Sequence, residues 1–163
     1  MKISAAYKGI ITGVLMIATA LVAYLILKLP VNQKEQYALY GIFTLGIVWS
    51  LVSEKNNANV VSFKDFFGVG FRTFMMATLL MVIFTFIYFK FDTSYRDLGI
   101  EENKVLLLKE GNHTADEIDK NAVQLKKIFL PMMVGGAVFK YLILGALVSL
   151  VGAGFLSQQK TKD

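Results

Sequence analysis

The chain has 163 residues, of which 55% are hydrophobic and only 18% charged. Its charged residues are clustered, so that four stretches carry no charge at all: residues 9–27, 36–53, 73–89 and 141–159. An α-helix needs about 17 to 25 apolar residues to cross the ~30 Å hydrocarbon layer of a bilayer. The composition therefore excludes a soluble domain and predicts an all-α integral membrane protein.

Charge and cysteine content exclude further classes. The chain has no cysteine, which rules out disulfides, thiol catalysis and the usual cysteine-based metal centres. Its net charge of +5 does not indicate nucleic-acid binding, because the Lys and Arg residues flank the apolar stretches as they do in membrane proteins. We expect contact with membrane lipids, no nucleic-acid partner and no cofactor.

The first two apolar stretches predict a helical pair. A span over residues 7–29 is too long for the apolar core of a signal peptide, although Lys2 and Lys8 precede it as in such peptides. Pro30 and Asn32 end it, and a second span follows over residues 36–53. Because the connection is short, the two spans should be antiparallel neighbours.

The third predicted span covers residues 63–91, and its start is marked by Ser62, which can cap a backbone amide. Asp65, three residues later, suits the positive end of the helix dipole. Twenty-nine residues correspond to roughly 43 Å of helix, so the first turns should lie in the headgroup region.

Residues 92–127 are polar but not featureless. Thr114 and Glu117 form a capping-box pattern after Gly111, and an apolar face repeats at helical spacing over Ile118, Ala122, Leu125 and Phe129. This predicts an extramembrane helical hairpin whose second arm runs into a fourth span over residues 128–156, with Pro131 bending or restarting the helix. The expected fold is one domain of four antiparallel transmembrane helices with this hairpin between spans three and four.

Two basic residues within the spans are candidate functional groups. Arg72 and Lys140 can lift their charges to the interface, which is the ordinary interpretation. Alternatively they, together with Lys64, hold an anionic lipid headgroup or a polyprenyl phosphate. The uncharged stretches contain no Asp or Glu, which counts against an ion-coupled transporter.

Small residues at four-residue spacing form a second candidate set. They create smooth strips on which another helix can pack closely, either within this chain or from a partner protein. The positions are Gly9 and Gly13 in the first span and Gly145, Ser149 and Ala153 in the fourth. His113, the sole histidine, is expected on the surface of the hairpin turn, because no nucleophile or metal-ligand set surrounds it in sequence.

The segment Ser62-Phe63-Lys64-Asp65-Phe66-Phe67-Gly68-Val69-Gly70, followed by the charged hairpin, resembles a bacterial family of four-span inner-membrane proteins catalogued as a domain of unknown function. The resemblance covers nearly the whole chain and is most specific over residues 60–92. It implies a bacterial inner-membrane location and a link to polyprenyl-phosphate glycosyltransferases. No active residues are established for that family, so no residue role carries over.

Taken with the absence of acids, cysteine and histidine from the spans, these observations predict a protein that is not an enzyme. We expect an accessory or scaffold subunit that docks a partner protein, with a membrane-associated glycosyltransferase as the partner implied by the resemblance. The alternative is a lipid or polyprenyl-phosphate binding or transport protein that uses Arg72 and Lys140. Basic residues are almost equally dense on the two sides of the membrane, and we expect both termini in the cytoplasm.

Overall fold

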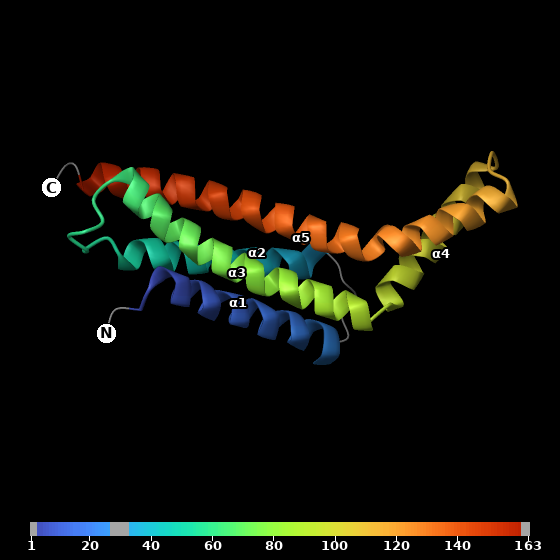
Figure 1. Ribbon diagram of the computed structural model, residues 1–163, viewed down its shortest axis with the longest axis horizontal. Coiled ribbons are helices and arrows are strands. Elements are labelled where there is room, and N and C mark those ends of the chain that lie inside the picture. The colour runs from blue at the N-terminus through green and yellow to red at the C-terminus, as the bar shows by residue number, and fades with distance from the viewer. Residues whose placement is uncertain (1–2, 27–32, 161–163) are drawn as a thin grey trace. The chain divides into compact units, whose positions relative to one another are not determined.

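The computed structural model describes residues 3–26 and 33–160, and it is helical throughout its regular parts (Figure 1). The elements in chain order are α1 (Ala5–Leu21), a π-helical turn η1 (Val22–Ile26), α2 (Gln33–Ser53), α3 (Phe63–Phe91), α4 (Ser94–Glu110) and α5 (Ala115–Lys160). Four helices in the described residues are long and apolar enough to span a membrane. The predicted all-α, four-span fold is confirmed.

The helix bounds follow the hydropathy closely. Helix α3 has the predicted bounds, and α2 ends at Ser53 as expected. The first span is described as α1 and η1 up to Ile26, and the rest of its predicted range, to residue 29, lies outside the described residues. Helix α5 runs unbroken through Pro131, so the helix does not restart there. Proline removes one backbone hydrogen bond, but the helical segments on both sides of Pro131 are long, and such a proline is tolerated within membrane-spanning helices.

Two helix starts are fixed by reciprocal capping, as the sequence predicted. Ser62 donates its backbone amide to the Asp65 carboxylate over 3.0 Å, and the Asp65 amide donates back to the Ser62 hydroxyl over 3.2 Å. Thr114 and Glu117 make the same exchange, over 2.8 and 3.3 Å, at the start of α5. Each box satisfies amides that the first helical turn leaves unpaired.

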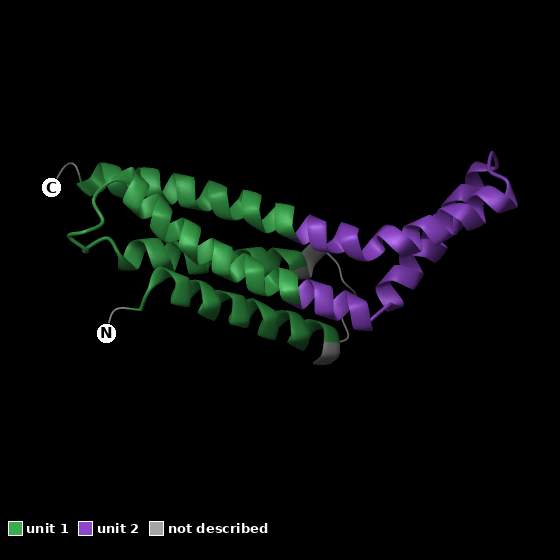
Figure 2. Ribbon diagram, in the orientation of Figure 1, with its two compact units in different colours: residues 1–83, 138–163 green, residues 84–137 purple. Residues whose placement is uncertain are grey.

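The chain divides into two compact units, shown in green and purple in Figure 2. Unit 1 comprises residues 1–83 and 138–163. Within it, Gly9 and Gly13 of α1 lie against successive turns of α3, so these two helices run parallel. Gly70 of α3 lies against Ser149 and Phe74 against Gly145, so α3 and α5 run antiparallel. These contacts give the alternating directions expected of consecutive spans.

Unit 2 comprises residues 84–137 and contains α4 with the adjoining parts of α3 and α5. Gly111 ends α4 with a φ of 69°, a left-handed conformation that glycine adopts without strain. The two arms pack through Ile118, which is 6% exposed, and through rings of Phe89, Tyr95 and Phe129 whose centroids lie 5.6 to 6.3 Å apart. The helical hairpin predicted from the capping box is confirmed.

Candidate functional site

The most unusual feature of unit 1 is a buried ion pair. Lys8 of α1 and Glu54, which follows α2, are 4% and 9% exposed, and the Lys8 Nζ lies 3.4 Å from the Glu54 Oε1. Lys8 also donates a hydrogen bond to the Ser53 hydroxyl, and its ammonium lies 5.9 Å from the centre of the Trp49 ring. Buried charges persist in proteins only when they are paired and hydrogen-bonded, and both conditions are met here.

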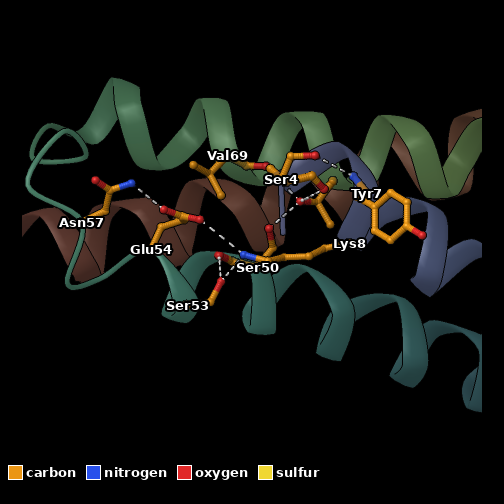
Figure 3. Close-up of polar contacts among 10 residues, drawn as sticks. Ser4, Tyr7, Lys8, Ser50, Ser53, Glu54, Asn57 and Val69 are labelled. Carbon is orange, nitrogen blue, oxygen red and sulfur yellow. Dashed lines mark hydrogen bonds and ion pairs between the residues drawn. The ribbon is translucent and has the colours of Figure 1, made fainter. Parts of the chain in front are cut away.

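Further hydrogen bonds extend this pair into a polar cluster, which we define as Lys8, Ser50, Ser53, Glu54 and Asn57 (Figure 3). The Asn57 side-chain amide donates to the second Glu54 oxygen over 2.7 Å. The Ser53 hydroxyl donates to the Ser50 carbonyl over 2.8 Å. The charged groups are thus satisfied by side chains from one helix end and the loop that follows it.

Helix α3 joins the cluster through Thr73, which is completely buried. Its hydroxyl oxygen lies 2.7 Å from the Ser50 hydroxyl, 3.0 Å from the Val69 carbonyl and 3.1 Å from the Ala5 carbonyl. One small side chain therefore links α1, α2 and α3 at the same level. In lipid, where helices gain little from hydrophobic association, such interhelical hydrogen bonds help to fix their register.

The end of α5 is anchored in the same region by Lys160. Its ammonium donates to the backbone carbonyls of Asn57 and Val60, over 2.6 and 2.8 Å, in the loop between α2 and α3. The loop carbonyls would otherwise need water or lipid headgroups as partners. All four helices of unit 1 are consequently tied together around the loop that contains Asn57.

This arrangement is suited to holding helices together. The lysine is engaged by Glu54 and Ser53, and the carboxylate receives bonds from Lys8 and Asn57, so the groups in the cluster satisfy one another. Among the described residues, no three His, Cys, Asp or Glu side chains are grouped so that they could hold a metal ion. The groups of the polar cluster neutralise each other's charge and form hydrogen bonds with one another.

Sequence reasoning missed the Lys8–Glu54 pair, although a signal was present. Lys8 is the last charge before the first uncharged stretch, and Glu54 is the first charge after the second. Two antiparallel spans joined by a short loop place these positions at the same boundary of the membrane. Opposite charges at equal depth on adjacent spans were therefore a sign of pairing.

The basic residues predicted to contact anionic lipids lie elsewhere. Lys64, Arg72 and Lys140 are all exposed, and the Arg72 Nε donates to the Gly68 carbonyl of its own helix over 3.1 Å. Because Gly70 faces Ser149 and Phe74 faces Gly145, Arg72 lies about two helical turns from the level of Lys140, on the side of α3 that faces away from α5. The structure does not gather Arg72 and Lys140 at one point.

The predicted small-residue strips face other helices of unit 1. A Cβ atom built on Gly9 would lie 2.3 Å from the Thr73 carbonyl oxygen, and one built on Gly145 would lie 2.5 Å from the Phe74 ring. A Cβ on Gly13 would meet Leu80 at 2.8 Å, while Ser149 and Ala153 are completely buried. Of the two predicted roles, packing within the chain occupies this face of both spans.

Unit 2 carries a different kind of surface. No residue of α4 is buried, and four large apolar side chains point outward from it. We call these residues the α4 outer surface: Leu98, Val105, Leu106 and Leu108, which are 43 to 65% exposed. Leu98 and Val105 are about two helical turns apart on one face, and the other two flank them. His113 is in the hairpin turn as expected, 3.2 Å from the Glu110 carboxylate.

A model for the family described as "Protein of unknown function (DUF4199)" matches residues 7–158. The match includes nearly all of both units. No curated protein and no solved structure is significantly similar to the chain. The chain belongs to the DUF4199 family.

Proposed function

We propose that this family member is a non-enzymatic accessory subunit of a bacterial inner membrane, where it docks and positions a partner protein through the α4 outer surface. The observation that carries this proposal is the exposure of four large apolar side chains on a hairpin that we place outside the membrane. Contiguous apolar patches that are exposed to water are uncommon on soluble surfaces, and large ones often mark interaction sites. A membrane-associated glycosyltransferase acting on a polyprenyl-phosphate carrier is the partner class that the sequence resemblance suggests.

The two units suit a division of labour. Unit 1 satisfies its buried charges internally through the polar cluster, which supports a role as a rigid anchor. Unit 2 exposes apolar side chains next to the acidic Glu101 and Glu102 and the basic Lys109. A mixed apolar and charged surface of this type resembles the core and rim of transient protein interfaces.

The second candidate function is binding of an anionic lipid or polyprenyl phosphate. The exposure of Arg72 and Lys140 on unit 1 favours it, since basic groups between or beside spans bind headgroup phosphates. Arg72 on α3 and Lys140 on α5 differ in level by about two helical turns, which argues against one shared phosphate and makes this the second candidate.

The docking proposal is tested by the double variant Leu98→Ser, Val105→Ser. Quantitative co-purification from native membranes in mild detergent should recover at least about tenfold less of a stoichiometric partner, because about 1.4 kcal/mol of lost contact energy corresponds to tenfold in affinity. The matched control is Val123→Ser, an equally exposed change on the other arm of unit 2. Equal partner recovery from both variants would contradict docking at α4.

The enzymatic part of the proposal has its own assay. The purified protein alone should not turn over lipid-linked sugar substrates, whereas adding it to a candidate glycosyltransferase should change the membrane retention or rate of that enzyme. Turnover by the protein alone would overturn the accessory role. A bound lipid phosphate that is lost from Arg72→Gln and Lys140→Gln variants would instead favour the second candidate.

Orientation is part of the same proposal, with both termini in the cytoplasm and the hairpin on the opposite side. A single cysteine introduced at Asn112, in the exposed hairpin turn, should react with a membrane-impermeant thiol reagent. The cells are labelled with the outer membrane permeabilised and the inner membrane intact. Labelling that requires permeabilised inner membranes would reverse this orientation.

A further inference from the structure

We propose that Lys140 is an intramembrane docking contact that pairs with a carboxylate on a transmembrane helix of another protein. This inference rests on the proposed docking function and specifies the chemistry of the partner at a second contact, separate from the α4 outer surface. It follows from the depth of Lys140, its exposure, and the distribution of acids along the chain.

The neighbouring residue fixes the depth of Lys140. Tyr141 packs against Phe43 of α2 with ring centroids 5.2 Å apart, and against Tyr40 at 6.0 Å. Phe43 lies close to the middle of the apolar window Gln36–Ser53. Along α5, the nearest flanking charges in sequence are Lys127 and Lys160, about 20 and 30 Å away at 1.5 Å per residue. Lys140 therefore begins near the centre of the apolar layer.

The side chain is directed away from the core of unit 1. Tyr141 is 6% exposed, whereas Lys140 is exposed, as are Ile143 and Leu147, which follow it on the same side of α5. No hydrogen bond or ion pair joins Lys140 to any of the side chains that the structure describes. Its charge thus faces the medium around the bundle, amid apolar side chains on which another helix can pack.

This chain supplies no carboxylate at that depth. After Asp119, the only acid is the terminal Asp163, and α3 has none between Asp65 and its end at Phe91. The first acid of the chain, Glu35, is at the beginning of α2, about 12 Å of helix before Phe43. A charged lysine in the apolar layer is costly unless it is paired. The counter-charge has to come from outside the bundle.

Depth distinguishes the candidate occupants. Lipid phosphates lie at the headgroup level, roughly 15 Å from the bilayer centre, whereas a lysine side chain reaches over little more than one helical turn of about 5.4 Å. A second copy of this chain would bring another lysine and no acid. A partner helix with Asp or Glu near its midpoint is the one occupant that matches both charge and depth.

A synthetic transmembrane peptide provides the test. Leucine–alanine peptides with a single central Asp, Asn or Leu are incorporated with the full-length protein into lipid vesicles, and association is measured by energy transfer. The Asp peptide should associate about tenfold more strongly than the Leu peptide. This preference should disappear with Lys140→Met, which removes the charge but keeps an unbranched side chain of nearly the same length, and persist with Lys140→Arg. Equal association of the Asp and Leu peptides with the wild-type protein would overturn the proposal.

Three controls identify the alternatives. The melting temperature in detergent should be unchanged or higher for Lys140→Met, which shows that lost binding is not lost folding. Glu35→Gln should leave the peptide preference unchanged, and an increase would mean that Lys140 already pairs within the chain. Loss of a co-purifying anionic lipid from Lys140→Met, with peptide association unaffected, would assign the residue to lipid and overturn the proposal.

Co-purification of the natural partner distinguishes the role of Lys140 from docking at the α4 outer surface. If Leu98→Ser, Val105→Ser releases the partner but Lys140→Met does not, docking stands and the Lys140 inference fails. If neither variant releases a partner, both fail. Once the partner is captured, the two charges can be exchanged: Lys140→Asp in this chain is combined with a lysine in place of the acid of the partner. This exchange should restore the complex.

Discussion

Unit 1 and unit 2 use the same helical backbone in opposite ways. Unit 1 buries polar side chains such as Lys8, Glu54 and Thr73 between its helices, beside large apolar ones such as Phe43, and exposes other apolar side chains such as Leu45. Unit 2 holds its polar groups at the surface, buries no residue of α4, and exposes leucines on the hairpin that we place outside the membrane.

The difference reflects what the surrounding medium contributes. Lipid tails are as apolar as leucine, so helix association in a membrane depends on close backbone approach and interhelical hydrogen bonds. Water, by contrast, drives apolar faces together, so an apolar face left open on an aqueous hairpin is available to a partner. Unit 1 should therefore be sensitive to small changes in packing and pairing, and unit 2 should tolerate them.

The two units should differ most when one charge is removed from each. Lys8→Met leaves Glu54 buried without its counter-charge and should cost about 3 to 5 kcal/mol of unfolding free energy. The matched change Lys120→Met removes one partner of an exposed pair in unit 2, in which both side chains are more than 70% exposed, and should cost at most about 0.5 kcal/mol. Reversible titration with a denaturing detergent in mixed micelles measures both.

The double variant Lys8→Met, Glu54→Gln separates pairing from packing. Removing both charges should recover much of the stability lost in Lys8→Met, because the uncompensated buried carboxylate is then gone. No recovery, or equal costs for the Lys8 and Lys120 variants, would mean that the polar cluster does not hold unit 1 together.

Glycine substitutions give the next largest effect. Gly9→Ala places a Cβ 2.3 Å from the Thr73 backbone carbonyl oxygen, which cannot move without shifting α3, so we expect a loss of about 1 to 3 kcal/mol. Gly41 in unit 1 and Gly135 in unit 2 have nothing within 4 Å of such a Cβ. Alanine at either should be neutral or stabilise by up to about 1 kcal/mol through helix propensity. Similar losses at all three positions would refute close packing at Gly9.

These contrasts show where sequence reasoning succeeds. Uncharged stretches and helix caps are local features, so the bounds of α3 and the exchange between Thr114 and Glu117 were predicted correctly. Which residues meet across helices depends on rotation and register, which hydropathy leaves open. Gly9, Gly145 and Ser149 were recognisable from their spacing, but Gly46, which faces Thr12, and Gly70, which faces Ser149, were not.

The candidate site was harder to predict for the same reason. Lys8 and Glu54 flank different spans, and only their shared depth relates them in the sequence. Two buried hydroxyls were also hard to predict as unpaired groups: Thr78 Oγ1 and Ser149 Oγ have no hydrogen-bond partner among the described residues. Their small size allows helices to approach; the four-residue spacing singled out Ser149, but no comparable spacing singled out Thr78.

The smallest expected effect is a pH dependence at the start of α4 in unit 2. Asp92 accepts a hydrogen bond from the Ser94 backbone amide over 2.9 Å at the start of α4. This bond, with further ones from the Ser94 and Tyr88 hydroxyls, lowers the pKa of the Asp92 carboxyl below its ordinary value. A lowered pKa in the folded state means that the ionised form contributes stability above the ordinary value of about 3.9, and that this contribution is lost as pH falls through the folded pKa.

The Ser94 amide resonance, followed by NMR of the full chain in micelles, should therefore titrate with a midpoint below about 3.9, and Asp92→Asn should abolish the transition. A midpoint at or above the ordinary value would show that the bond does not persist in the folded hairpin, and the start of α4 would then be held by the hydrogen bonds between Thr93 and Asp97.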